Sequence, residues 1–330
     1  MKINLDEIER ILIVRLSALG DCVSAIPVFS ALRQRFPHKH IAWAVQDNYA
    51  PLIRNLPGVD EIIVFPRQRW KNMKSIWGKT TEVLSLARRL RMRRFDLVVD
   101  IQSNTKSATL SFLTGAPYRI GHGPGEAKEI SPWIINRPVT HPADMKHIII
   151  RNLNLLTPLG IEISEPCFPL NPDPFAQRTI LEWLRAHDIT EKGYCLLFPF
   201  CGRQEKEWPQ EHFTRLAKEL SQSGYRVLFC WTPGKDEMLK QMIPANTENN
   251  VIIGPKTDIP ELVELIRSAG ICCGGDTGPI QIAGALNIPN IALFGPTYPE
   301  RTGPWTTSGI VSLDSEPDIV SKTIKNAYSG

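Results

Sequence analysis

Short runs of β-branched and other apolar residues alternate along this chain with longer segments whose apolar residues recur at helical spacing. A strand followed by a helix, repeated many times, predicts parallel sheets joined by right-handed crossovers, and so an α/β fold. In the first half the expected strands are 11–15, 41–45, 61–65 and 97–101, and the expected helices 22–36, 79–93, 104–113 and 145–158. In the second half the expected strands are 194–198, 226–231, 251–253, 271–273 and 291–294, and the expected helices 174–187, 209–223, 235–243, 258–268 and 279–286.

A proline-rich segment interrupts the alternation near the middle of the chain. Residues 165–174 contain four prolines, which favours an extended linker and prevents a helix from crossing it. The chain has 330 residues, enough for two domains that each bury a core. We therefore expect two Rossmann-like domains, 1–168 and 169–330. A last helical stretch, 318–328, could pack on either domain.

Charge is distributed unevenly between the two halves. Residues 1–170 hold 23 Lys and Arg against 15 Asp and Glu, whereas residues 171–330 hold 15 against 19. The excess lies in segment 67–94, with ten basic residues and one acid, Glu82. Nucleic acid is not the expected partner, because the net charge is +4 and the sequence shows no recognition helix, RNP motif or series of stacking aromatics. The arginines from Arg88 to Arg94 could simply form a solvated helix face.

Composition and cysteine usage exclude other classes of protein. Charged residues make up 22% and apolar residues 42% of the chain, so neither a disordered nor a membrane-embedded chain fits. No apolar stretch approaches the roughly 20 residues of a membrane span, and the amino terminus resembles neither a signal nor a transit peptide. The seven cysteines form no C-x-x-C pair and have no histidines at zinc spacing. We expect reduced core thiols, no metal site and a cytoplasmic protein.

The loop after the first expected strand could carry catalysis. Strand 11–15 runs into Leu16-Ser-Ala-Leu-Gly-Asp21, and ligands of open α/β sheets bind outside the carboxyl ends of the strands. Gly20 and Asp21 would then stand at the mouth of a cleft. Alternatively, Asp21 merely caps the helix that follows.

A glycine-rich loop, Gly274-Gly-Asp-Thr-Gly-Pro279, follows expected strand 271–273 and precedes a helix. Its glycines permit close approach of a ligand, and the helix start offers free N–H groups to a diphosphate. Alternatively, it is a tight turn with Asp276 or Thr277 as N-cap. Its spacing matches neither the Walker loop nor the dinucleotide fingerprint. No flanking strand and helix are expected around the other glycine cluster, Gly121, Gly123 and Gly125.

A third loop, from Cys201 to Pro209, follows expected strand 194–198. Arg203 and Lys206 at the carboxyl end of a strand could neutralise a leaving phosphate without a metal. A solvated charged loop is the alternative. The three loops indicate one specific chemistry only in combination.

Five short motifs, in this order and spacing, resemble the family 9 glycosyltransferases, the lipopolysaccharide heptosyltransferases, and most of all heptosyltransferase I. They are RLSALGDCVSAIP, DLVVDIQSNTKSA, GRQEKEWPQEHF, GGDTGPIQIAGAL and FGPTYPERTGPW. The likeness covers nearly the whole chain. It implies a fold of the GT-B type, with two Rossmann-like domains whose parallel sheets face a central cleft. The first domain would bind the acceptor and the second the nucleotide sugar.

The resemblance also implies roles for the matching residues. Asp21 matches the catalytic base and Lys206 the phosphate-binding lysine of an inverting transfer that uses no metal and no cofactor. The implied donor-binding residues are Gly20, Cys201, Arg203, Lys206, Asp276, Thr277, Gly278, Gln281, Gly295 and Thr297. The implied acceptor-binding residues are Arg67, Arg69, Trp70, Lys71, Lys74, Gln102 and Lys106.

The implied reaction moves heptose from ADP-L-glycero-D-manno-heptose to Kdo of the lipopolysaccharide inner core. The partners would be this donor, an anionic lipid-linked Kdo acceptor and, through the positive surface, the cytoplasmic face of the inner membrane. The alternatives are transfer to the first heptose, another nucleotide sugar, a sugar-nucleotide 2-epimerase and an inactive lipid-binding relic. The sequence departs from the family at three positions: Gln281 replaces a histidine, Ser103 a glycine, and Tyr298 an aspartate.

Overall fold

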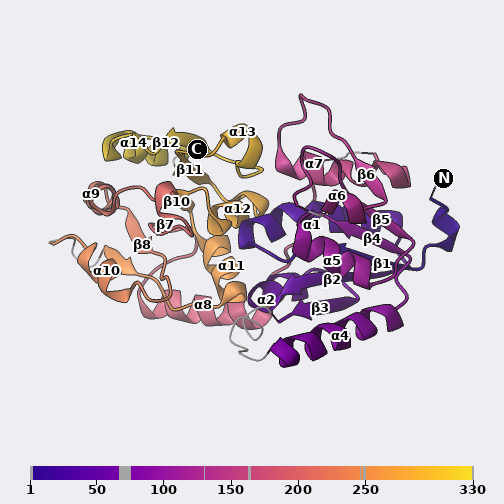
Figure 1. Ribbon diagram of the computed structural model, residues 1–330. Coiled ribbons are helices and arrows are strands. Elements are labelled where there is room, and N and C mark those ends of the chain that lie inside the picture. Colours follow the sequence, from indigo (N-terminus) through magenta and orange to yellow (C-terminus); the bar gives the residue numbers. More distant parts are fainter. Residues whose placement is uncertain are drawn as a thin grey trace. The chain divides into compact units, whose positions relative to one another are not determined.

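The computed structural model describes residues 3–66, 76–129, 131–162, 165–245, 247 and 250–328, with the backbone alone for 76–80 (Figure 1). The chain divides into two compact units, Met1–Pro169 and Leu170–Gly330. The division falls in the proline-rich segment, one residue after the boundary expected from the sequence. Each unit is built around its own sheet and is described by itself. No helix of the described ranges is long and apolar enough to cross a membrane.

The first unit contains six parallel strands in the order β3-β2-β1-β4-β5-β6. They are β1 (Arg10–Val14), β2 (His40–Gln46), β3 (Glu61–Phe65), β4 (Leu97–Asp100), β5 (Tyr118–His122) and β6 (Arg137–Val139). The sequence predicts the first four but neither β5 nor β6. Because β5 runs through Gly121, the expectation that no strand flanks that glycine cluster is wrong. The register pairs Val14 with Asp100 and Asp100 with Gly121, so the carboxyl ends of three adjacent strands meet at one edge.

Helices cover both faces of this first sheet. They are α1 (Leu19–Arg35), α2 (Ala50–Arg54), α4 (Ile76–Met92), α5 (Thr105–Leu113), α6 (Ser131–Ile134) and α7 (Ile148–Asn154), with 3-10 turns η1 (Leu5–Glu7), η2 (Asp47–Tyr49) and η3 (Thr157–Leu159). Helix α1 contacts α7, whereas α5 contacts both α4 and α6. Right-handed crossovers place α4, α5 and α6 together on one face, because the chain passes from β3 through β4 and β5 to β6 in one direction.

Several helix boundaries differ from the sequence expectation; α4, for example, begins at Ile76 instead of residue 79. Helix α1 begins at Leu19 instead of residue 22, because its N-cap is Ala18 and Asp21 already lies in the first turn. The helix expected at 145–158 is shorter, and consists of α7 followed by η3. Pro158 lies in the first turn of η3, where its missing N–H leaves no hydrogen bond unmade.

The second unit has the strand order β12-β11-β10-β7-β8-β9. Its strands are β7 (Tyr194–Phe198), β8 (Arg226–Phe229), β9 (Val251–Ile253), β10 (Ile271–Gly275), β11 (Asn290–Phe294) and β12 (Gly309–Ser312), of which the sequence does not predict β12. Its helices are α8 (Pro174–Ala186), α9 (Gln210–Gln222), α10 (Asp236–Gln241), α11 (Ile259–Ser268), α12 (Gly278–Ala285), α13 (Pro299–Thr302) and α14 (Pro317–Tyr328), with 3-10 turn η4 (Gln204–Lys206). Helix α14 packs on α9 and on β10, β11 and β12, so the last helix belongs to this unit.

The central strands of both sheets are buried on both faces, as the strands of parallel sheets usually are, whereas the end strands β3, β6 and β12 are partly exposed. Every residue of β7 and of β11 is buried, and their side chains join the core of the second unit. All seven cysteines are free. Five of them are buried as expected, but Cys167 is exposed and Cys201 is partly exposed, so these two are not core thiols.

Candidate functional site

Asp21 lies in the first turn of α1, beyond the carboxyl end of β1. Its Oδ2 accepts a hydrogen bond from the N–H of Ala18 at 3.0 Å. The capping role considered from the sequence is therefore present. The side chain is nevertheless 49% exposed. Each carboxylate oxygen has two lone pairs, so Asp21 can hold the helix start and still accept a hydrogen bond from an incoming hydroxyl.

Arg15 is the partner of Asp21, and sequence reasoning missed it. It follows the last residue of β1, and its Nη2 lies 2.7 Å from Asp21 Oδ1. Its Nη1 donates to the carbonyl of Ile101, the residue after β4, at 3.1 Å. The Arg15 side chain is only 11% exposed. A guanidinium held in this way fixes the orientation of the carboxylate. The sequence signal that could have identified Arg15 is its position as a cation directly after an apolar strand.

Gln102 connects the loops that follow the adjacent strands β1 and β4. Its Oε1 accepts hydrogen bonds from the N–H of Leu16 at 2.8 Å and of Ser17 at 3.3 Å. Lys106 is exposed in the first turn of α5. The remaining acceptor residues expected from the resemblance lie outside the described residues: Arg67, Arg69, Trp70, Lys71 and Lys74.

A buried polar cluster lies at the ends of β4 and β5. Burial raises the pKa of Asp100 to about 6, although the N–H groups of Ser103 and Gln102 donate to its carboxylate. Ser103 has a φ of +47°, in the left-handed region that favours glycine. Its hydroxyl donates to the carbonyl of Asp100 and accepts from the N–H of His122. The Ser103 side chain thus makes two hydrogen bonds at a position where the family 9 glycosyltransferases usually have a glycine.

Two histidines extend this cluster. A hydrogen bond of 2.7 Å joins His122 Nδ1 to His141 Nε2, and His141 Nδ1 lies 3.0 Å from Asn154 Nδ2. Burial, with the neighbouring His141, lowers the pKa of His122 to about 3, and burial also lowers the pKa of His141. Both rings are therefore neutral near pH 7. Neither histidine is recognisable as a site residue from the sequence, because His122 lies on β5 and His141 follows β6, two strands that the sequence does not predict.

In the second unit, Lys206 and Asp276 form an ion pair across two loops. Lys206 ends η4, after β7, and its Nζ lies 2.7 Å from Oδ2 of Asp276, which follows β10. Their side chains are 19% and 9% exposed. The hydroxyl of Thr302 also donates to Asp276 Oδ2, at 3.3 Å. Lys206 is therefore not part of a solvated loop, and Asp276 is not the N-cap of α12.

Glycines allow these two loops to approach each other. A Cβ added to Gly275 would lie 2.8 Å from both Cys201 Sγ and the carbonyl oxygen of Lys206, closer than real Cβ atoms come. Helix α12 begins at Gly278 directly beyond this contact, with Thr277 at its N-cap position. The Thr277 hydroxyl donates to the carbonyl of Gly275 at 3.1 Å and makes no cap bond. Thr277 therefore leaves the N–H groups of Gly278 and Ile280 uncapped, and Pro279 between them has no N–H.

The other expected donor residues occupy contrasting environments. Gln281 Nε2 donates to the carbonyl of Thr302 at 2.7 Å, which ties α12 to α13. Arg203 is 72% exposed and lies 3.5 Å from Glu205, which is 63% exposed. Gly295 directly follows β11, and a Cβ added to it would lie 2.6 Å from Cδ1 of Leu313. Thr297 Oγ1 is buried and has no hydrogen-bond partner within the described ranges, so it could still donate to a ligand.

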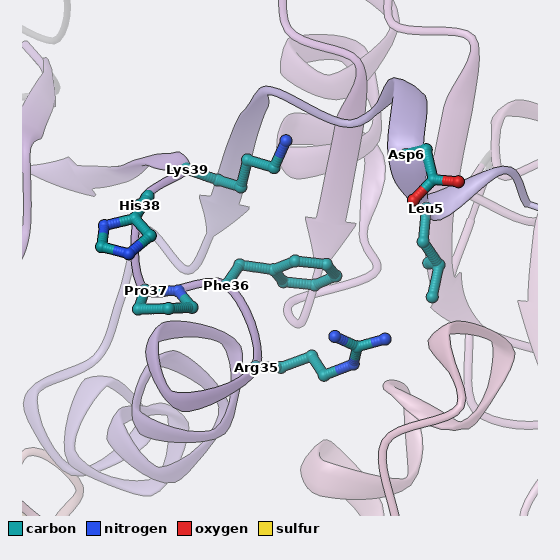
Figure 2. A pocket seen from close by; sticks show the side chains of 7 residues that line it. All are labelled: Leu5, Asp6, Arg35, Phe36, Pro37, His38 and Lys39. Atoms are coloured by element: carbon teal, nitrogen blue, oxygen red, sulfur yellow. The ribbon is translucent and has the colours of Figure 1, made fainter.

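A pocket of about 250 Å³ lies near the amino ends of β1 and β2, at the sheet edge opposite Asp21 (Figure 2). It is lined by η1 and by the segment that follows α1. Lys39 pairs with Glu9, and the Arg35 guanidinium lies over the ring of Phe36. None of the residues expected to take part in chemistry lines this pocket.

A family model for glycosyltransferase family 9 (heptosyltransferase) matches residues 83–328. The lipopolysaccharide core heptosyltransferase OpsX of Haemophilus influenzae is 26% identical over 317 residues, which cover 92% of this chain and 84% of that protein. Lipopolysaccharide heptosyltransferase 1 of Escherichia coli K12 is 25% identical over 316 residues, covering 94% and 95%. Lipopolysaccharide heptosyltransferase 3 of the same strain is 28% identical over 301 residues, covering 87% and 83%.

Solved structures share the fold of this chain. The crystal structure of a family 9 glycosyl transferase from Veillonella parvula has a TM-score of 0.84 at 19% identity and covers 97% of both chains. The E. coli heptosyltransferase WaaC with ADP has a TM-score of 0.79 at 24% identity and covers 96% of this chain and 99% of its own. With the two parallel sheets, these structures confirm the α/β fold of the GT-B type.

Proposed function

This chain belongs to glycosyltransferase family 9 and is a glycosyltransferase, and on that premise we propose that it transfers heptose from ADP-heptose to Kdo of the lipopolysaccharide inner core. Its relatives are named as heptosyltransferases of the lipopolysaccharide core. The observation that carries the proposal is the carboxylate of Asp21. Arg15 and the N–H of Ala18 orient it at the carboxyl edge of the first sheet, while half of it stays exposed.

Asp21 would act as the general base of an inverting transfer. Its carboxylate takes the proton of the acceptor hydroxyl while that oxygen forms a bond to the anomeric carbon. The bond from the anomeric carbon to the diphosphate breaks, and its electron pair leaves with ADP. Arg15 touches neither substrate in this scheme and acts as a positioning residue for Asp21.

The second unit would bind the donor and stabilise the leaving diphosphate. Lys206 offers a cation to the developing negative charge, and the start of α12 at Gly278 offers backbone N–H groups and a positive dipole end. The buried hydroxyl of Thr297 is a further donor. These groups neutralise the leaving group without a divalent metal, so the proposal includes metal-independent transfer.

The acceptor is the finer part of the proposal. The relatives include heptosyltransferases 1 and 3 at similar identity, so likeness alone does not choose between Kdo and a heptose as acceptor. The basic segment 67–94 favours the more anionic partner, because the carboxylates of Kdo and the phosphates of its lipid complement arginine and lysine. The same positive charge supports peripheral contact with an anionic membrane.

The proposal is tested by measuring ADP release from ADP-heptose in EDTA, with Kdo-lipid A, with the same acceptor already carrying one heptose, and without acceptor. Release with Kdo-lipid A alone is the expected result. Release with the heptosylated acceptor alone would move the assignment to the next transfer. Release without acceptor would contradict acceptor-dependent transfer, and no release from folded protein in any tube would overturn the heptosyl assignment.

A further inference from the structure

We propose that the outer face of the helical layer α4, α5 and α6 binds the surface of an anionic lipid bilayer. This face, called the α4–α6 surface, combines large exposed apolar side chains with arginines. The inference deepens the proposed peripheral contact, and it rests on the proposed function in that the acceptor is attached to a lipid. The surface consists of Leu84, Arg88, Arg91, Met92, Phe112 and Trp133.

The topology of the first unit brings these three helices side by side (Figure 1). Helix α5 contacts both α4 and α6, and all three cover the same face of the sheet. Met92 and Phe112 lie in the last turns of α4 and α5, and Trp133 lies in α6, just before β6. A Cβ on Gly115, in the loop after α5, would lie 4.0 Å from Cγ of Arg91. The Arg91 side chain therefore lies between the ends of α4 and α5.

The apolar side chains of this layer are strongly exposed. The exposed fraction is 64% for Leu84, 72% for Met92, 54% for Phe112 and 89% for Trp133. Single exposed apolar residues are ordinary on protein surfaces, but several on one layer of helices indicate an interaction surface. Tryptophan and phenylalanine are suited to the boundary between lipid headgroups and acyl chains.

The charge around these residues determines the kind of partner. Arg88, Arg89, Arg91 and Arg94 are exposed, and none of them forms an ion pair with a residue in the described ranges. Arg93 differs, because it bonds to Glu61 at 2.5 Å. Unpaired arginines beside exposed apolar residues match an anionic interface, where each basic residue raises the affinity roughly fivefold.

The second unit provides an internal comparison. Phe175 on α8 is 79% exposed, more than Leu84, Met92 or Phe112 and less only than Trp133 among the apolar residues of the α4–α6 surface. Residues 171–330, however, carry more acidic than basic side chains, 19 against 15. An exposed aromatic residue in that setting lacks the positive charge that would attract anionic lipid. Phe175 and Arg185, which lie near opposite ends of α8, therefore give matched controls.

Co-sedimentation of the full chain with phosphatidylcholine vesicles, with and without phosphatidylglycerol, tests the proposal. We expect binding to the anionic vesicles that weakens as salt rises. The R88Q/R91Q variant should lose roughly 30-fold in affinity, and the F112S/W133S variant should lose most of its binding. The F175S and R185Q variants should bind like the parent chain. Circular dichroism should show that every variant is folded.

Several outcomes would overturn the proposal. They are equal binding to vesicles without phosphatidylglycerol, unchanged binding by both surface variants, and an equal loss in the F175S and R185Q controls. Self-association that depends on Trp133 without vesicle binding would assign the surface to a second copy of the chain. The vesicle assay contains no donor, so its outcome is independent of the proposed transfer. ADP release with a water-soluble Kdo acceptor should be unchanged in the F112S/W133S variant, whose two residues lie outside the basic segment 67–94. Absence of release from the parent chain would count against the proposed function alone.

Discussion

The two units of this chain repeat one sheet topology, and yet they present opposite charges at corresponding places. In each unit, numbered within itself, the strand order is third, second, first, fourth, fifth, sixth. The polar residues cluster after the first and fourth strands in both cases, where the strand order reverses and open α/β sheets bind ligands. In each unit, the shared topology therefore places the loops after the first and fourth strands next to each other.

The difference lies in which charge each unit leaves accessible. In the first unit the cation Arg15 is 11% exposed and the carboxylate of Asp21 is 49% exposed. In the second unit the carboxylate of Asp276 is 9% exposed and the cation Lys206 is 19% exposed. In each pair one charge is the more exposed, by a wide margin in the first unit and by a narrow one in the second, where both side chains are largely buried. The first unit thus offers an acid group suited to removing a proton, and the second a cation suited to a phosphate.

The largest expected effect comes from removing the accessible carboxylate. Asp21→Asn should lower the rate of transfer by about 100-fold or more, because the amide cannot take the acceptor proton. The amide oxygen can still accept the hydrogen bond from Ala18, so the start of α1 should persist. Binding of ADP, measured by calorimetry, should be unchanged, because the residues proposed to bind the donor belong to the other unit. A near-native single-turnover rate would reject Asp21 as the base.

Removing the accessible cation should act on the donor instead. Lys206→Ala should weaken ADP binding by about 10- to 100-fold, the value of one charge-assisted hydrogen bond. It should also lower the melting temperature, because Asp276 would be left buried without its ion-pair partner. Arg203→Ala is the matched control, since Arg203 lies on the same loop but is 72% exposed. Equal losses of ADP affinity in both variants would remove the distinction between the two residues.

A smaller effect is expected from the buried cation that orients Asp21. Arg15→Met should lower kcat by about tenfold without changing the KM for the donor, because the carboxylate loses its fixed orientation. Arg15→Lys should recover part of this loss, since a lysine can still pair with Asp21 but cannot also bond to the carbonyl of Ile101 in the same way. A change in the donor KM, or no recovery by lysine, would indicate a purely structural role.

The smallest expected effect concerns the buried acid behind this edge. The pKa of Asp100 is raised to about 6 in the folded state, so the folded protein binds more protons than the unfolded protein between about pH 4 and pH 7. The free energy of unfolding therefore falls as pH rises from about 4 to 7. Between pH 5 and pH 7 the unfolding free energy should fall by about 1 kcal/mol more in the parent chain than in Asp100→Asn. Parallel urea-unfolding profiles for the two proteins would contradict the raised pKa.

The sequence predicts the described strands except β5, β6 and β12. Two of these three, β6 and β12, lie at the end of a sheet, whereas the other two end strands, β3 and β9, are predicted. β1, β4, β7 and β10 are short apolar runs between turn residues, which is the signal that buried parallel strands carry. β6 contains Pro138, and β12 begins with Gly309, and both residues are unfavourable in a strand interior. Each of these two strands pairs on one side only, at the end of its sheet, where weak strand formers are tolerated. These segments form strands because they lie at the end of a sheet, and that position cannot be read from the sequence.

The sequence predicts which residues belong to the candidate site, but it does not predict which of them pair with each other. Asp21, Lys206 and Asp276 each follow an apolar strand, which is visible in the sequence. The pairing of Lys206 with Asp276 joins residues 70 positions apart, and it depends on β7 and β10 lying side by side. The sequence pattern places Arg15 at the end of an expected strand, 11–15, and gives no sign of its pairing with Asp21. Its role depends on the turn into α1, which brings Asp21 back toward it.

Helix α14 has a consequence for the order in which the two units form during synthesis. Its Val320 and Ile324 are fully buried in the core that β7, β10 and β11 share. Residues 1–169 hold every element of the first sheet, so this unit can fold on the ribosome once they have emerged. The second core stays open until α14 has been made. A ribosome that stalls before residue 317 would thus display a complete first unit and a second unit with an uncovered core.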